Sequence, residues 1–250
     1  MSVIQPSFWD YSALAGSYDQ RADYCESLLT DTLQSMNLGS SDLVLEVGAG
    51  TGKLTVHLAQ LASPVIALEP SGAMRAHALR KDSLANVRWL AGVGESLPVR
   101  HATMSLVAYG SSFNVLSPQQ ALNECARVLK PQGHWLALWN HRELKDPLQS
   151  AVEQRIRHHL PNFDPGSRRQ TPALLVEQHG SFTKAICAER AFVVEIKSRD
   201  WLTAWSSHAT LQRQAGSSLP RVLSDIRDLI GARETVAVPY TTRLWTAQKK

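Results

Sequence analysis

The 250-residue sequence lacks the features that would tie it to a membrane or to an oxidising compartment. No stretch approaches the roughly 18 uncharged apolar residues of a transmembrane helix, so we expect no membrane partner. The N-terminal residues lack the basic start and apolar core of a secretory signal, and we expect none. An odd, scattered set of three cysteines, Cys25, Cys125 and Cys187, predicts reduced thiols rather than a disulfide framework or structural zinc. Together these absences predict a soluble, cytoplasmic protein.

Concentrated positive charge is also lacking, although the formal net charge is +4. The first fifty residues hold one basic and seven acidic side chains, so the excess of Lys and Arg lies beyond them. No basic run is longer than two residues, whereas a nucleic-acid binder gathers such residues on one face. This argues against a nucleic-acid partner. Internal repeats are absent too, which excludes solenoids and propellers.

Short apolar runs alternate with helical patterns through the first part of the chain. The apolar runs predict strands at residues 43–47, 65–68, 87–90, 104–109 and 135–139. Helical patterns cover residues 11–38, 54–61, 71–84 and 119–129. Strands and helices in turn, joined by short loops, predict a doubly wound α/β fold.

The rest of the chain predicts two more strands, at residues 190–196 and 240–247, with a helical stretch over 201–230 between them. The expected fold is therefore a mainly parallel seven-stranded sheet. A helical cap follows strand five and also lies between the last two strands. We divide the chain into a helical N-terminal arm (1–40), an α/β core (41–140), a cap that includes strand six (141–235) and a terminal strand (236–250).

Three glycines, Gly48, Gly50 and Gly52, lie between the first predicted strand and the helix after it. Such a turn lets a ligand approach the backbone closely. A dinucleotide fingerprint would need a glycine at position 53, and a P-loop would need Ser or Thr after Lys53; neither is present. Glu46, two residues before Gly48, would repel a phosphate and suits a ligand with an ammonium group.

A second carboxylate, Glu69, ends the next predicted strand and is followed by Pro70 and Ser71. In a doubly wound sheet, ligands bind outside the carboxyl ends of the strands. A carboxylate at that position can accept both hydroxyls of a ribose.

With these residues, several further segments resemble class I S-adenosylmethionine (SAM) dependent methyltransferases, in particular the small-molecule branch that includes trans-aconitate-type enzymes. The segments are Ala15-Gly-Ser-Tyr-Asp, Gly92-Val-Gly-Glu-Ser-Leu-Pro, Ala126-Arg-Val-Leu-Lys-Pro-Gln-Gly-His, Leu138-Trp-Asn-His-Arg and Pro239-Tyr-Thr-Thr-Arg-Leu-Trp. The resemblance implies a Rossmann-like methyltransferase fold with SAM as cofactor and an arm over the cofactor site.

The resemblance also implies cofactor-binding roles for particular residues. Glu46 and the 48–52 loop, including Ala49, would hold the methionine end, and Glu69 with Pro70 the ribose. The adenine would lie near Ser71, Met74, Gly94 and Glu95, and the sulfonium near Ser111. Two residues depart from the family pattern: Val93 replaces a polar residue near the adenine, and Ser105 replaces an aspartate.

Methyl transfer is an in-line displacement on an already activated carbon, so positioning can supply most of the rate enhancement. A general base is needed only where the acceptor must lose a proton. The candidates over the strand ends are Asn114, Asn140, His141, Arg142 and Tyr18. We expect Asn140 to orient a substrate, His141 to be a possible base, and Arg142 to pair with a substrate carboxylate or a surface acid.

Two aromatic groups complete the candidates. Tyr11 and Tyr18 resemble the aromatic arm that folds over SAM in relatives, and the pair Trp201 and Trp205 has the spacing of a core stripe within the cap. No metal-ligand spacing occurs among the histidines, so no metal is expected.

The sequence thus predicts methyl transfer to a small-molecule acceptor. Three alternatives stay open. One is a cyclase that consumes SAM itself, forming azetidine-2-carboxylate and releasing methylthioadenosine. The others are a nucleic-acid methyltransferase and a non-catalytic SAM-binding protein.

Overall fold

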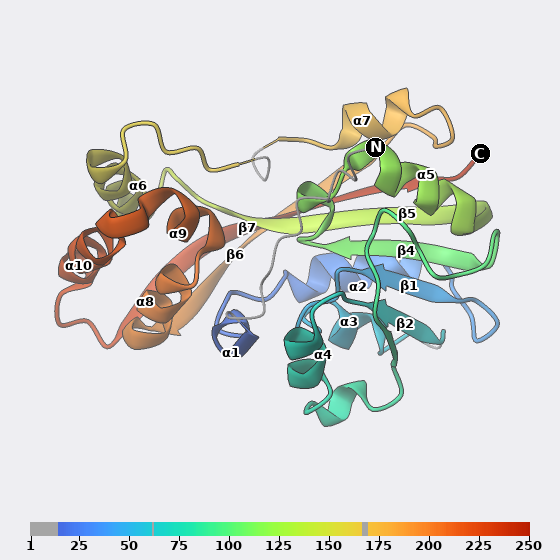
Figure 1. The fold of residues 1–250 in the computed structure, drawn as a ribbon, viewed down its shortest axis with the longest axis horizontal. Coiled ribbons are helices and arrows are strands. Elements are labelled where there is room, and N and C mark those ends of the chain that lie inside the picture. The colour runs from blue at the N-terminus through green and yellow to red at the C-terminus, as the bar shows by residue number, and fades with distance from the viewer. Residues whose placement is uncertain (1–14, 62, 167–169) are drawn as a thin grey trace, which may run out of the picture.

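A computed structural model describes residues 15–61, 63–166 and 170–250 of the chain. Its centre is one seven-stranded sheet in the order β3-β2-β1-β4-β5-β7-β6 (Figure 1). Only β7 runs antiparallel to its neighbours. The strands are β1 Val44–Val47, β2 Val65–Leu68, β3 Arg88–Leu90, β4 Met104–Gly110, β5 Leu129–Arg142, β6 Ile186–Lys197 and β7 Thr235–Gln248. The predicted fold class is confirmed.

Helices cover both faces of the sheet because alternate strand residues point to opposite sides. Leu45, Val107 and Trp135 belong to one buried cluster, which α5 (Pro118–Val128) and α7 (Ala173–Gln178) cover. Their neighbours Val44 and Leu106 belong to the other. The helices on that second side are α2 (Glu26–Ser35), α3 (Thr55–Leu58) and α4 (Gly72–Ala78).

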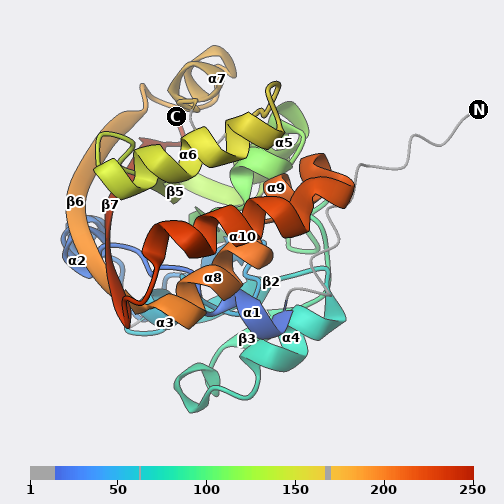
Figure 2. The ribbon, with the colours of Figure 1, turned by 90° about the vertical axis from the view of Figure 1, so that its left-hand side faces the viewer.

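The cap has its own buried cluster and packs at one end of the three longest strands, β5, β6 and β7. This end is at the left in Figure 1 and faces the viewer in Figure 2. The helices of the cap are α6 Pro147–His159, α8 Ser198–Ser206, α9 Ala209–Ala215 and α10 Leu219–Ile230. Trp201 and Trp205 meet edge to face with their ring centroids 6.1 Å apart, and both are buried, as their spacing predicts. Because β7 contributes Val236 and Val238 to this cluster, the cap is fixed to the sheet.

The prediction of one helix over 11–38 is wrong for the described part of that range. The chain forms α1 (Ala15–Tyr18) and then α2, with non-helical residues 19–25 between them. Residues in this interval form hydrogen bonds with other elements. The Asp19 carboxylate bonds to α4, and the carbonyl oxygens of Ala22 and Asp23 accept from β5. Tertiary contacts therefore replace helical hydrogen bonds there.

Other boundaries also differ from the sequence prediction. The helical stretch 201–230 is three α-helices, interrupted at residues 207–208 and again from Gly216, whose φ is +49°. Strand β5 begins at Leu129, six residues before the predicted start. Leu129 already pairs with β4, and residues 130–133 form a bulge before pairing resumes at His134. Strands β6 and β7 are longer than predicted because all of β6 pairs with residues 235–246 of β7.

Candidate functional site

The glycine loop between β1 and α3 has one open side. All three glycines have positive φ, +71° at Gly48, +59° at Gly50 and +88° at Gly52. A Cβ at Gly48 would lie 2.6 Å from the Cβ of Ser112, and one at Gly52 would lie 2.6 Å from Leu84 Cδ1. A Cβ at Gly50 would meet no heavy atom within 4 Å. Gly48 and Gly52 therefore allow close packing within the protein, while Gly50 presents backbone to open space.

Glu69, at the end of β2, lies directly beside Gly50. Its Oε2 accepts the Gly50 N–H at 2.9 Å and its Oε1 accepts the Ser71 N–H at 2.8 Å. Burial raises the pKa of this carboxyl, and the two backbone donors act against that rise. Ser71 also caps α4 by accepting the Met74 N–H, which fixes the start of that helix. The fold thus brings the predicted loop, Glu69, Ser71 and Met74 to one place.

Glu46 lies behind the loop rather than in the open space. The side chain is 1% exposed, and its Oε2 accepts a hydrogen bond from Thr55 Oγ of α3 at 2.6 Å. Burial raises the pKa of Glu46 to about 8, with a further rise from the nearby Glu69 charge. The carboxyl is therefore mainly protonated at neutral pH, whereas the sequence led us to expect an ionised partner for an ammonium group.

The segment after β3 approaches the same region. A Cβ at Gly94 would collide with Leu116 and Val47, so Gly94 allows this loop to pack on the end of β1. Glu95 Oε1 accepts the Ser117 N–H at 2.9 Å, which fixes the chain just before α5. The adenine role expected for both residues stays a prediction.

Both departures from the family pattern can be located in the fold. Val93 pairs with Ser96 in an isolated bridge within the same loop. Ser105 is the second residue of β4 and donates to Asp42 at 2.6 Å. It therefore lies at the opposite end of the strand from Ser111 and does not reach the glycine loop.

Residues 15–24 of the N-terminal arm lie over the glycine loop, and below 'the arm' means these residues. Asp19 is its main anchor: Thr51 Oγ donates to Asp19 at 2.5 Å, Lys81 Nζ donates at 3.0 Å, and His77 Nε2 lies 2.9 Å away. Burial acts to raise the pKa of Asp19, but these hydrogen bonds outweigh it and the pKa is lowered. Tyr18 belongs to this arm, whereas Tyr11 lies outside the described residues.

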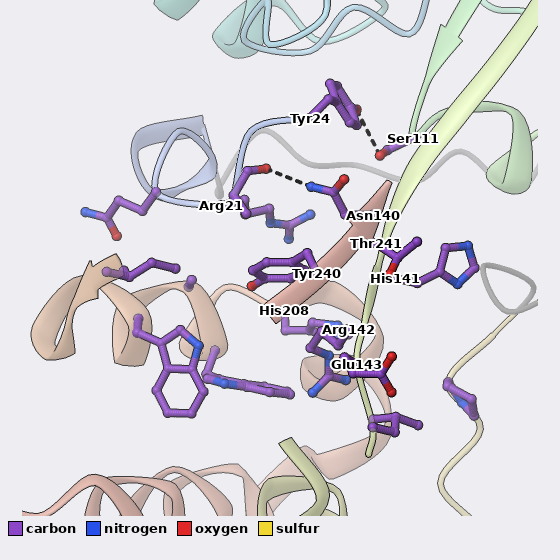
Figure 3. Close-up of a pocket in the computed structure, with 18 of the residues that line it drawn as sticks. Arg21, Tyr24, Ser111, Asn140, His141, Arg142, Glu143, His208, Tyr240 and Thr241 are labelled. Atoms are coloured by element: carbon purple, nitrogen blue, oxygen red, sulfur yellow. Dashed lines mark hydrogen bonds between the residues drawn. The ribbon is translucent and has the colours of Figure 1, made fainter. Parts of the chain in front are cut away.

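A cavity of about 490 Å³ lies between the arm, the strand ends and the cap; we call it the arm–cap cavity (Figure 3). Tyr24 and Ser111, which follows β4, meet at its edge, with their hydroxyl oxygens 2.9 Å apart. Of the predicted cofactor residues, only Ser111 lines the cavity. The space for a second molecule therefore adjoins the predicted cofactor site and does not coincide with it.

The three predicted catalytic residues, Tyr18, Asn140 and His141, all line this cavity, but their side chains differ in direction. Asn140 donates to the carbonyls of Asp23 at 2.9 Å and Ala22 at 3.4 Å. Its Oδ1 accepts from Thr242 Oγ at 2.6 Å. The amide nitrogen thus ties the arm to β5, while the amide oxygen is held by β7; the expected role of Asn140 in orienting a substrate stays a prediction.

His141 is next to Asn140 on a strand, and its side chain therefore points to the opposite face (Figure 3). Its ring packs beside the Trp139 and Trp245 rings, with centroids 6.4 Å from each. This surrounding does not support the role of a base. Asn114 is not among the residues that line the cavity.

The sequence analysis missed Asp19, Tyr24, Arg21 and Tyr240. Tyr240 is the first residue of the last predicted strand, but its position opposite Arg142 depends on the β5–β7 register, which the sequence alone does not give. The other three, Asp19, Arg21 and Tyr24, lie within the predicted helical range 11–38. Their contacts are with distant segments, which no local sequence pattern indicates.

Neither a metal cluster nor a membrane-spanning helix is found in the described part of the chain. That part contains no group of three or more His, Cys, Asp or Glu side chains arranged to hold a metal ion. None of its helices combines the length and apolar character that crossing a bilayer requires.

Comparison with known proteins places these observations in a family. A model described as "Methyltransferase domain" matches residues 45–137. An uncharacterized methyltransferase of Schizosaccharomyces pombe is 30% identical over 137 residues, which is 54% of each chain. An uncharacterized methyltransferase of Alkaliphilus oremlandii is 30% identical over 148 residues, or 57% of this chain and 68% of the relative. This chain spans about half the length of the first of these relatives.

A solved structure shows the same fold over nearly the whole chain. It is a putative type II methyltransferase from Anaeromyxobacter dehalogenans, with a TM-score of 0.63, 18% identity, and coverage of 92% of this chain and 97% of that one. The sheet order, the glycine loop with Glu69 beside it, and these similarities agree. The chain belongs to the class I SAM-dependent methyltransferase family.

Proposed function

We propose that this protein transfers the methyl group of SAM to a small-molecule acceptor that binds in the arm–cap cavity. The observation that carries the proposal is this cavity, which meets the cofactor residues at Ser111. Its volume of about 490 Å³ lies within the range of about 300–1,000 Å³ that small-molecule sites occupy.

The residues around Gly50 suit the cofactor. The open space at Gly50 admits a ligand against the backbone, and Glu69 is the adjacent carboxylate. Each of its oxygens accepts one backbone N–H and has a second lone pair, so Glu69 can accept two ribose hydroxyls without losing its present bonds. An ammonium group near Glu46 would favour its ionised form and lower its pKa.

SAM carries its methyl group on a sulfonium sulfur, and the thioether that leaves, S-adenosylhomocysteine, is a good leaving group. The protein then has to bind the acceptor, orient it towards the methyl group and exclude water. The arm serves these tasks because it is held at both ends: Asp19 binds Thr51 and α4, and Asn140 binds the carbonyls of Ala22 and Asp23. Tyr24 and Ser111 place two hydroxyl groups where the cofactor site meets the cavity.

The cavity also favours transfer over cyclisation of SAM. A reaction within SAM alone needs no second molecule, so the arm–cap cavity would have no occupant. Transfer to an acceptor gives this space a role, and the aromatic and charged residues that line it give a small molecule groups to bind.

Product analysis tests the proposal. The protein is incubated with SAM labelled at the methyl group, with and without a panel of small acids, amines and phenols. The expected products are S-adenosylhomocysteine and one labelled acceptor, with no methylthioadenosine above the enzyme-free control. Methylthioadenosine with azetidine-2-carboxylate in the absence of any acceptor would instead make SAM the sole substrate. Label transferred to RNA or DNA but to no small molecule would also contradict the proposal.

A further inference from the structure

The arm–cap cavity is positively charged. Among the described residues that line it, five are Lys or Arg and one, Glu143, carries a carboxylate. Two of the cations are neutralised by acids at its rim: Lys53 pairs with Asp23 at 2.6 Å and Arg243 pairs with Glu189 at 2.7 Å. The described lining therefore holds more cations than acids, which favours an anionic occupant over a neutral or cationic one.

Two of these cations, Arg21 and Arg142, converge on Tyr240 (Figure 3). Arg142 is cross-strand to Tyr240 in the β5–β7 register, and its guanidinium lies 4.3 Å from the Trp205 ring centroid. Arg21 reaches in from the arm and donates to Ser207 O at 2.8 Å. Burial raises the pKa of Tyr240, while the charges of Arg142 and Arg21 lower it, so both guanidinium groups act on the same phenol.

Each of these guanidinium groups lies over an aromatic ring. Arg21 lies over the Tyr18 ring at 4.2 Å, in addition to its bond to Ser207 O. The face of Trp205 supports Arg142. Guanidinium groups fixed in this way lose little side-chain freedom when they bind an oxyanion through their N–H groups.

The wall that the cap contributes is apolar. Trp201, Trp205 and Phe163 are each at most 4% exposed and belong to the buried cluster of the cap. Ile196 of β6 adds to the same wall. The cavity therefore has one cationic end and one aromatic side, and the body of an occupant would be buried against the aromatic side.

We propose that the acceptor is an amphipathic monoanion, whose single carboxylate lies between Arg21 and Arg142 beside the Tyr240 hydroxyl. Its aromatic or aliphatic body packs on Trp201 and Phe163 of the cap wall. A polyanion would place further charges against this apolar wall, where an unpaired charge is costly. The inference rests on the proposed function, since it names the substrate class for the same cavity.

Direct binding tests the inference without requiring turnover. Two probes of equal shape, 3-phenylpropanoate and 3-phenylpropanamide, are titrated calorimetrically in the presence of saturating S-adenosylhomocysteine. Propane-1,2,3-tricarboxylate is the polyanion. Arg21→Gln and Arg142→Gln are compared with the matched control Arg190→Gln, an arginine on β6 outside the cavity that pairs with Asp31. Thermal unfolding of each variant establishes that it folds.

The acid should bind about 10- to 100-fold more tightly than the amide, as expected for charge-assisted hydrogen bonds to guanidinium. Arg21→Gln and Arg142→Gln should each reduce this preference and leave amide binding unchanged, and Arg190→Gln should alter neither. Equal binding of acid and amide, tighter binding of the tricarboxylate, or an unchanged preference in both cavity variants would overturn the inference. Failure of the unchanged protein to bind S-adenosylhomocysteine would contradict the proposed function, whereas the acid–amide comparison would still decide the inference.

Discussion

Gly48 and Gly50 have the same left-handed backbone but different surroundings, so the same substitution at each should have different effects. Alanine in this conformation costs about 1–2 kcal/mol at either position. At Gly48 the new Cβ would lie 2.6 Å from Ser112 Cβ, whereas at Gly50 nothing lies within 4 Å. Overpacking adds about 1–3 kcal/mol at Gly48 alone. The free energy of unfolding should therefore fall by about 2–5 kcal/mol in Gly48→Ala and about 1–2 kcal/mol in Gly50→Ala.

Scanning calorimetry measures this difference. For a chain of this size about 2–4 °C of Tm corresponds to 1 kcal/mol, so Gly48→Ala should melt about 2–12 °C below Gly50→Ala. Binding should show the reverse order. The Cβ of Gly50→Ala occupies the open side of the loop, so S-adenosylhomocysteine should raise its Tm least. Gly48→Ala, once folded, should keep more of that rise.

A second substitution isolates the contact. Ser112→Gly removes the Cβ that Gly48→Ala would strike, so a double-mutant cycle should show a favourable coupling of about 1–3 kcal/mol between these positions. Equal Tm losses in Gly48→Ala and Gly50→Ala would refute the reasoning, and so would a coupling indistinguishable from zero.

Three further results are expected. Folded Glu46 keeps its proton up to about pH 8, whereas the unfolded chain loses it near 4.5, so stability should fall as pH rises through that window. Glu46→Gln should therefore gain Tm relative to the unchanged protein between pH 5 and pH 8; a constant difference would contradict this. Asp19→Asn should weaken S-adenosylhomocysteine binding about tenfold by releasing the arm, whereas Asp23→Asn, at an exposed ion pair, should not; equal effects in a calorimetric titration would count against the anchor. A thiol reagent should modify Cys187 in the native protein and reach the two buried cysteines only in denaturant; three reactive native thiols would be inconsistent with this fold.

The sheet and its order follow from local patterns. Short apolar runs such as β1 and β2 are buried on both faces, so each appears as a continuous hydrophobic segment between turns. Glu69 and the glycine loop come together because parallel strands end at one edge of the sheet. These parts of the site were predictable because each depends on one strand and the turn after it.

The arm and the cavity depend on contacts between distant segments. Cys25 N donates to Thr242 Oγ, a separation of 217 residues, and Arg21 donates to the carbonyl of Ser207. No helical or strand period encodes such pairs. The helical prediction over 11–38 is wrong because polar side chains such as Asp19 gain more from these partners than from helix propensity.

The roles expected for Asn140 and His141 depend on where the fifth strand ends. The sequence predicts an end at residue 139, whereas β5 extends to Arg142, so the two-residue period of a strand sends these two side chains to opposite faces. What it could not show is that the amide of Asn140 holds the arm.

The central claim, that the loop around Gly50 and Glu69 holds SAM, is tested most directly by calorimetric titration with S-adenosylhomocysteine. The titration compares the unchanged protein, Glu69→Gln, and the control Glu26→Gln, an exposed acid on α2. We predict one site per chain, an affinity about 10- to 100-fold weaker in Glu69→Gln because the ribose loses a charged acceptor, and no change in Glu26→Gln. Absence of binding to the unchanged protein, or an unaltered affinity in Glu69→Gln, would contradict the claim.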